Sequence, residues 1–191
     1  VSLDKTELTY GEDSPIISYT FSGLKSSDKE DDFTITKTKF AEKLDAGTYT
    51  AAVTISGDKT KFYEINVNTA DFTVKQKAAT ITINEIKDIV YGDKVPDLSA
   101  KVDGVLDGDS LSYALETDYT VGKKPGNYYN VKVVFDKNAE ANKNYAITTI
   151  VTTFYVGTKD LTIKLNNTPT VAVGKTYKVE AEHLEKIGLV A

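Results

Sequence analysis

The chain has 191 residues, of which 40% are hydrophobic and 27% are charged, and its formal net charge is −5. Its cationic side chains are lysines spread along the chain without a basic stripe, so the composition argues against nucleic acid as a partner. The lack of cysteine excludes disulfides and thiolate metal sites. Without 18 consecutive apolar residues, we expect no direct insertion into a membrane.

An internal repeat organises the sequence. The motif Tyr10-Gly11 has its counterpart in Tyr91-Gly92, 81 residues further on (91 − 10), and a proline follows each motif at the same spacing. Repetition at this period is typical of a tandem array of similar domains. We therefore expect a first β module over 1–77, a second over 78–158, and a partial third module or C-terminal cap over 159–191.

Apolar and polar residues alternate with a period of two along most of the chain, which predicts strands. We expect about five strands in each module, with turn glycines between them. The tyrosine of each Tyr-Gly motif is expected to cover the core and keep its hydroxyl in water. The expected strands cover 2–10, 16–22, 32–38, 47–56 and 64–76 in the first module, and 79–91, 97–103, 110–116, 127–136 and 145–157 in the second.

The passage between the modules, residues 74–81, contains no proline, glycine or serine. Such a short joint limits hinge freedom, and it predicts an extended, semi-rigid array in which Ala78 and Ala79 pack at the junction.

The pattern predicts an all-β fold of small β-sandwich-like modules in tandem, either Ig-like or β-grasp-like. A grasp fold normally carries a helix across its sheet, and the best position for one is 37–44, which has no clear counterpart in the second module. We therefore favour the helix-poor sandwich. One further short helix is possible over 180–187, near the end of the chain.

The sequence contains few candidates for catalysis. His183 is the only histidine and lies in the incomplete third segment, so a catalytic histidine paired with a nucleophile is not expected. The acidic stretches 28–32 and 107–110 could offer oxygen ligands to Ca²⁺, but EF-hand spacing is missing and solvated turns explain them better. We expect no enzyme activity, no cofactor and no metal site.

Two pairs of neighbouring aromatic residues, 62–63 and 128–129, are candidates for an exposed ligand-binding platform. Strand alternation places one member of each pair in the core, and we take Tyr129 and Tyr63 as the speculative ligand-binding residues. A covalent bond between a lysine and Asn66, Asn68 or Asn130 is a further possibility, although no spacing identifies a set of partners.

The strand ending in Tyr-Gly-acid, the following proline, the later Gly-x-Tyr and the final Tyr-x-Ile and Phe-x-Val strands resemble the MBG-type, Ig-like repeats of bacterial cell-surface proteins. The resemblance covers residues 1–158. It weakens afterwards, where Val173-Gly174 replaces Tyr-Gly.

This resemblance implies an extracellular repeat on a bacterial surface, attached to the cell wall through other parts of the protein. It favours a non-catalytic stalk or spacer, or a weakly adhesive unit toward host glycans or surface proteins. The alternative is a carbohydrate-binding accessory module of a larger secreted enzyme. Neighbouring repeats are the expected partners, and the chain is expected to be a monomer.

Overall fold

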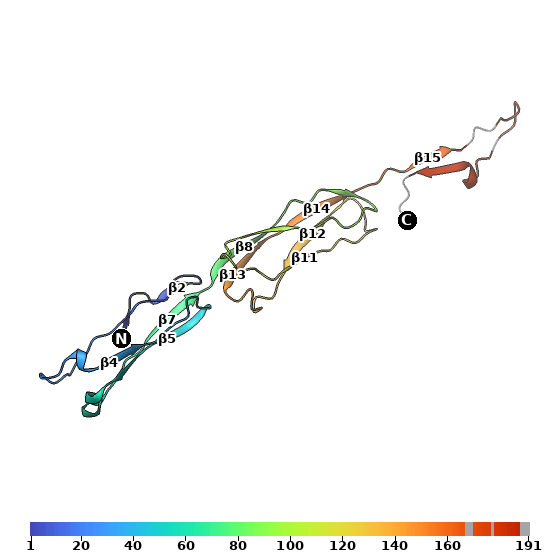
Figure 1. Ribbon diagram of the computed structural model, residues 1–191. Coiled ribbons are helices and arrows are strands. Elements are labelled where there is room, and N and C mark those ends of the chain that lie inside the picture. The colour runs from blue at the N-terminus through green and yellow to red at the C-terminus, as the bar shows by residue number, and fades with distance from the viewer. Residues whose placement is uncertain (167–169, 177, 188–191) are drawn as a thin grey trace. The chain divides into compact units, whose positions relative to one another are not determined.

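The structure is a computed structural model that describes residues 1–166, 170–176 and 178–187, with the side chain of His183 left out (Figure 1). In these ranges the chain forms strands and three short 3₁₀ helices, and no helix is long and apolar enough to cross a membrane. The predicted all-β class is confirmed. The 3₁₀ helices are η1 (Glu30–Asp32), η2 (Asp58–Phe62) and η3 (Ala181–His183).

The strands follow one another along the whole described chain. In the first repeat they are β1 (Ser2–Leu3), β2 (Glu7–Thr9), β3 (Ile17–Ser18), β4 (Thr34–Lys37), β5 (Gly47–Ala51), β6 (Val53–Ser56) and β7 (Ala70–Lys75). In the second they are β8 (Lys77–Ile83), β9 (Ile89–Val90), β10 (Ala100–Asp103), β11 (Ala114–Thr117), β12 (Asn127–Val134), β13 (Tyr145–Ile150) and β14 (Thr152–Gly157). The last two are β15 (Thr162–Leu165) and β16 (Leu184–Ile187), which pair antiparallel.

Contacts divide the chain into two compact units. Unit 1 contains residues 1–81, 102–113 and 135–148, and unit 2 contains 82–101, 114–134 and 149–191. Unit 1 therefore holds the first repeat together with the segments of the second repeat that pack against it.

Each repeat has one main sheet built on the same plan. In the first repeat the order is β2-β7-β5, with β2 parallel and β5 antiparallel to β7. In the second it is β11-β12-β14-β9, with β9 parallel and β12 antiparallel to β14. The remaining sheets are β1-β3, β4-β6 and β10-β8-β13. In both repeats, therefore, the strand before the Tyr-Gly motif runs parallel to the last strand.

Several predicted strands are wrong in length, because the chain changes sheet within them. The expected strand 47–56 is interrupted at Ala52, with β5 in one sheet and β6 in another. The expected strand 145–157 is interrupted at Val151 and is likewise divided between two sheets. A strand that bends from one layer to the next is common where two sheets share a core. The predicted helix over 180–187 is also wrong, since a single 3₁₀ turn is followed there by β16.

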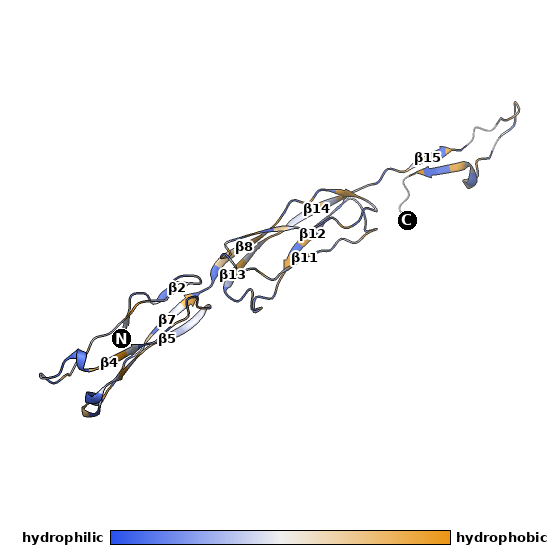
Figure 2. Cartoon of the chain, viewed as in Figure 1, coloured by the Kyte–Doolittle hydropathy of each residue, from blue (hydrophilic) through white to orange (hydrophobic). Residues whose placement is uncertain are grey.

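The inward-facing residues of the strands form the cores. In unit 1 the buried cluster contains Leu8, Tyr10, Leu44, Phe72, Val74, Ala79 and Tyr145, with a smaller cluster of Ile17, Ala51 and Val53. In unit 2 the cluster contains Ile83, Tyr119, Tyr129, Val131, Phe154 and Val156. Figure 2 shows hydrophobic residues along the strands, whereas the short helical turns of the first repeat, η1 and η2, are largely hydrophilic.

A triad of aromatic rings is common to both cores and fixes how the repeats correspond. In each, a tyrosine of one strand lies opposite a phenylalanine of the last strand, and a third ring packs edge-on against that phenylalanine. The third ring lies 5.0 Å from the phenylalanine, between ring centroids, in the first repeat and 5.7 Å in the second. The matched residues are Phe40, Tyr49 and Phe72 in the first repeat and Tyr119, Tyr129 and Phe154 in the second.

Candidate functional site

The Tyr-Gly motif of the first repeat forms a tight turn at the end of β2. The backbone N–H of Tyr10 donates to the carbonyl of Lys75 at 2.8 Å, and the N–H of Glu12 donates to the carbonyl of Thr9 at 2.9 Å. Gly11 has a φ of +92°, in the left-handed region that side-chain-bearing residues rarely adopt. Glycine is therefore required at the tip of this turn.

The second repeat forms the same turn at the end of β9. The N–H of Tyr91 donates to the carbonyl of Gly157 at 2.9 Å, and the N–H of Asp93 donates to the carbonyl of Val90 at 3.0 Å. Gly92 has a φ of +90°. The turn is thus a repeated structural element of this chain.

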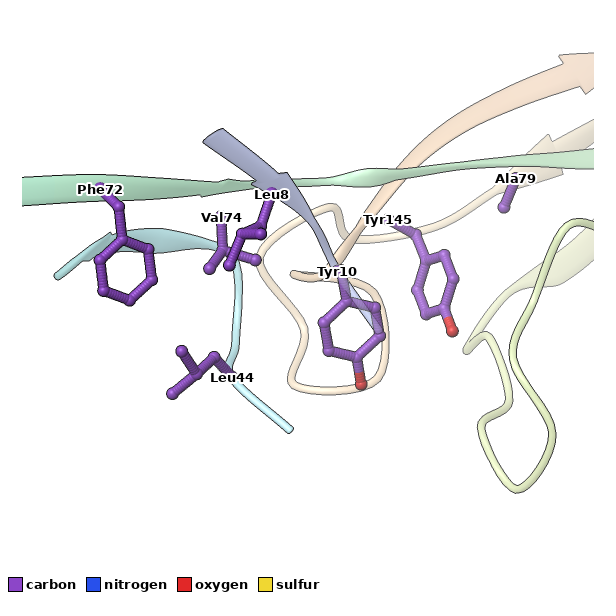
Figure 3. Close-up of a cluster of buried hydrophobic side chains, with 7 residues drawn as sticks. All are labelled: Leu8, Tyr10, Leu44, Phe72, Val74, Ala79 and Tyr145. Carbon is purple, nitrogen blue, oxygen red and sulfur yellow. The ribbon is translucent and has the colours of Figure 1, made fainter. Parts of the chain in front are cut away.

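The turn of the first repeat is covered by residues of the second. The ring of Tyr10 packs edge-on against the ring of Tyr145, with centroids 5.4 Å apart, and both residues are buried. Figure 3 shows the two rings side by side, with their hydroxyls on the same side. A Cβ atom built on Gly11 would lie 2.4 Å from Cδ1 of Leu106, so an added methyl group would push the end of this leucine side chain aside.

The carboxylate of Asp109 receives the hydroxyls of both tyrosines. Tyr10 donates to Oδ2 at 2.9 Å, Tyr145 donates to the same oxygen at 2.6 Å, and Nζ of Lys43 lies 2.6 Å from Oδ1. The Lys43 ammonium, followed by the Tyr145 hydroxyl, holds the pKa of Asp109 below its usual value. Contrary to expectation, therefore, the Tyr10 hydroxyl is not left in water.

A second polar contact lies beside the first. The side-chain amide of Asn144 donates to Oδ1 of Asp45 at 2.7 Å and accepts from the N–H of Ala46 at 2.8 Å. Nζ of Lys143 lies 2.8 Å from Oδ2 of Asp45 and is the main cause of the lowered pKa of that carboxyl group. Since Asn144 is 6% exposed, its amide groups need these partners.

The two speculative ligand-binding tyrosines lie in different surroundings. Tyr129 is 9% exposed, packs against Tyr119 and Phe154, and donates its hydroxyl to the carbonyl of Lys124 at 2.8 Å. Tyr63 is half-buried and donates its hydroxyl to Asp28 at 2.5 Å. Both residues serve as core and network groups in this structure.

An aromatic pair with one exposed ring lies next to Tyr129 in the sequence, on the outer face of the β11-β12-β14-β9 sheet. Tyr128 is 70% exposed and lies opposite Tyr155, with ring centroids 5.2 Å apart. Asn130, two residues along the same strand, donates its side-chain amide to Asp118 at 3.2 Å. In the first repeat, Thr48 and Thr73 form the corresponding cross-strand pair, so the aromatic pair belongs to the second repeat alone.

The acidic stretches do not assemble into a metal-binding cluster among the described residues. Asp28 and Asp32 share the ammonium of Lys59, at 2.9 and 2.6 Å, and Asp109 is held by Lys43 and the two tyrosines. His183 lies in η3, and its side chain falls outside the description.

Comparison with known proteins identifies the family. The model of the MBG domain (YGX type) matches twice, over residues 1–73 and 79–155. The chain belongs to this family. The match confirms the resemblance seen in the sequence, and MBG domains are non-catalytic repeat modules typical of bacterial surface proteins. No curated protein and no solved structure matches the chain.

Sequence reasoning missed the residues that receive the Tyr-Gly turn. A solvated turn around Asp109 predicts no partner for its carboxylate, and the expected strand 145–157 assigns no contact to Tyr145. The signal was present, because Asp28 and Asp109 are separated by the same 81 residues as the two Tyr-Gly motifs (109 − 28). A carboxylate that keeps the repeat spacing of a turn motif is a candidate partner for that turn.

Proposed function

We propose that the chain is a non-catalytic spacer of an extracellular bacterial surface protein, in which each MBG domain engages its neighbour through the Tyr-Gly turn. The family match supports the surface location, and the tandem match over 1–73 and 79–155 supports a repeated unit. Attachment to the cell wall would then come from other parts of the protein.

The observation that carries this proposal is what the two repeats have in common. They share the Tyr-Gly turn, the aromatic core triad and a carboxylate–tyrosine pair, whereas the acidic loops differ in sequence. The hydrogen bond from the turn to this pair connects Tyr10 of the first repeat with Asp109 of the second, 99 positions apart. Repetition thus preserves a way of linking repeats, which is what a spacer requires.

The proposal is tested by screening the purified chain for ligands on a glycan array and against mucins and host surface proteins. A spacer predicts no signal above that of an unrelated β protein at concentrations up to about 100 μM. A saturable signal that an excess of the same free ligand abolishes, and that an unrelated ligand leaves unchanged, would contradict the spacer and favour an adhesive role.

A second candidate, carbohydrate binding, is favoured by the exposed ring of Tyr128 and the half-buried ring of Tyr155 beside it. Aromatic rings stack on the apolar faces of sugars. Asn130, two residues along β12 from Tyr128, and its partner Asp118 would offer hydrogen bonds to the sugar hydroxyl groups. If the array gives a glycan signal, Tyr128→Ala is expected to abolish it, and Thr48→Ala at the matching position of the first repeat is expected to leave it unchanged. A signal that Tyr128→Ala does not reduce would rule out this pair as the site.

A further inference from the structure

The first repeat contains a second copy of the residues that receive the Tyr-Gly turn. The N–H of Leu106 donates to the hydroxyl of Tyr145 at 3.1 Å, and the N–H of Lys25 donates to the hydroxyl of Tyr63 at 3.2 Å. Leu106 and Lys25 occupy corresponding positions, 81 residues apart (106 − 25). The tyrosines correspond with a spacing of 82 (145 − 63).

The carboxylates correspond as well. Asp109 accepts the Tyr145 hydroxyl at 2.6 Å, and Asp28 accepts the Tyr63 hydroxyl at 2.5 Å. The N–H of each aspartate donates to the carbonyl three residues earlier, at 3.0 Å for Asp109 and 2.8 Å for Asp28. The same local fold, with the same two polar groups, is therefore present in both repeats.

The two copies differ in what covers them. In the second repeat, Tyr10 and Gly11 lie on the receiving residues, and Asn144 beside them is only 6% exposed. In the first repeat, Phe62, which corresponds to Asn144, is 74% exposed. Around it is an open pocket of about 500 Å³, lined by Lys25, Ser27, Asp28, Lys59, Phe62 and Tyr63.

We propose that this open pocket is a docking site for the Tyr-Gly turn of another YGX-type repeat joined ahead of this one in the same polypeptide. Its tyrosine would donate its hydroxyl to Asp28 and pack edge-on against Tyr63, as Tyr10 does with Asp109 and Tyr145. The glycine of the turn would lie on Lys25, at the position where Gly11 lies on Leu106.

The charges of the open pocket specify the incoming repeat further. Lys25 is found where the second repeat has Leu106. Asp28 already forms an ion pair with Lys59, whose Nζ lies 2.9 Å from Oδ1 of the carboxylate. Lys61 corresponds to Lys143, which forms an ion pair with Asp45 at 2.8 Å. The pocket therefore fits a turn accompanied by a carboxylate at the position of Asp45.

This inference rests on the proposed function insofar as it assumes an array of repeats. It can nevertheless fail separately, since the contact between Tyr10 and Asp109 is tested by other variants described below. A chain without docking at the open pocket could still be a two-repeat spacer.

The experiment extends the full chain with a copy of its own residues 1–81 placed directly ahead of Val1. Val1 corresponds to Thr82, because Leu8 on β2 and Ile89 on β9 occupy equivalent places beside the last strands, so residue 81 of the copy precedes it in register. The copy supplies Tyr10, Gly11 and Asp45 in the order that the second repeat already accepts.

The readout is the reactivity of a single thiol. Since the chain contains no cysteine, Phe62→Cys in the original chain gives one labelling site, whose modification rate is measured with and without the extension. Docking is expected to slow labelling by at least tenfold, because the corresponding Asn144 is buried. Ile16→Cys is the matched control: Ile16 is 66% exposed, its counterpart Asp97 is also exposed, and its rate is expected to stay unchanged.

A further variant shows whether the turn is responsible. Tyr10→Ala within the added copy is expected to restore most of the labelling rate of Phe62→Cys, with the circular dichroism spectrum of the extended chain retained. Labelling within twofold of that of the unextended chain would overturn the proposal. Protection that persists in the Tyr10→Ala copy would overturn it as well.

Discussion

Replacing Gly11 with alanine tests how closely the Tyr-Gly turn approaches the second repeat. Alanine in the left-handed conformation costs about 1 kcal/mol of folding free energy wherever it occurs. At Gly11 the added methyl group would also lie 2.4 Å from Cδ1 of Leu106. Because the end of the half-buried Leu106 side chain can move, this overpacking should cost a further ~1 kcal/mol, at the low end of the usual range. We therefore expect Gly11→Ala to lower the free energy of unfolding by about 2 kcal/mol.

Gly108 offers a matched control for the conformational part of this cost. Its φ is +83°, and a Cβ built there would have no described atom within 4 Å. Gly108→Ala should therefore cost about 1 kcal/mol, from backbone strain alone. The difference between the two substitutions measures the contact with Leu106.

The contact is isolated by combining Gly11→Ala with Leu106→Ala in a double-mutant cycle. In the chain with alanine at position 106, the added methyl group meets no leucine, so Gly11→Ala should cost only about 1 kcal/mol. Unfolding in urea is followed by far-ultraviolet circular dichroism, since the chain contains no tryptophan. If Gly11→Ala costs no more than Gly108→Ala, or costs the same whichever residue is at position 106, the packing argument is refuted.

Three further predictions concern the polar contacts. Tyr145→Phe removes the hydroxyl that bonds the Asp109 carboxylate and should lower the free energy of unfolding in urea by about 2 kcal/mol. Tyr63→Phe should lower it clearly less, because Tyr63 is only half-buried, and equal losses would contradict this. The folded-state pKa of Asp109 is lowered, so its contribution to stability is present above pH 3.8 and is lost as the pH falls through the folded-state value. The urea concentration at the midpoint of unfolding, measured from pH 6 to 2, should accordingly decrease once the pH is below 3.8. The decrease should be less steep in Asp109→Asn, and equal slopes would count against the assignment. Asn142 is fully buried, and its side chain bonds backbone groups of Ser112 and Asp136, so Asn142→Ala should lower the free energy of unfolding by about 2–3 kcal/mol. A loss under about 0.5 kcal/mol would show that water replaces those bonds.

The sequence predicted the repeated features of this chain because they depend on local rules. A glycine at positive φ and strands of alternating polarity each follow from a few neighbouring residues. The period itself was evident from the spacing of Tyr10-Gly11 and Tyr91-Gly92. These signals were enough to place the turns and the all-β class.

The sequence could not show where strands change sheet or which tyrosine faces the core. β5 and β6 are separated only by Ala52, and nothing in the local pattern marks the change of partner strand. Similarly, one extra residue after Gly126 moves Tyr128 to the outer face and places Tyr129 opposite Phe154. A shift of one residue reverses every side chain of a strand, and only the pairing with the neighbouring strand determines it.

The receiving residues were missed for a different reason. Asp109 and Tyr145 are 36 residues apart, and Tyr10 is 99 residues from Asp109, so no local pattern connects them. Only a comparison of both repeats at a fixed spacing would have shown that each aspartate has its own tyrosine partner.

The central claim is that the Tyr-Gly turn of the first repeat is held by the second repeat through Asp109. It is tested most directly by a double-mutant cycle that combines Tyr10→Phe with Asp109→Ala and measures the free energy of unfolding in urea. The 2.9 Å hydrogen bond between these residues predicts a coupling energy of about 1 kcal/mol, so the double variant should lose less than the sum of the single losses. Losses that add to within about 0.3 kcal/mol would contradict the claim.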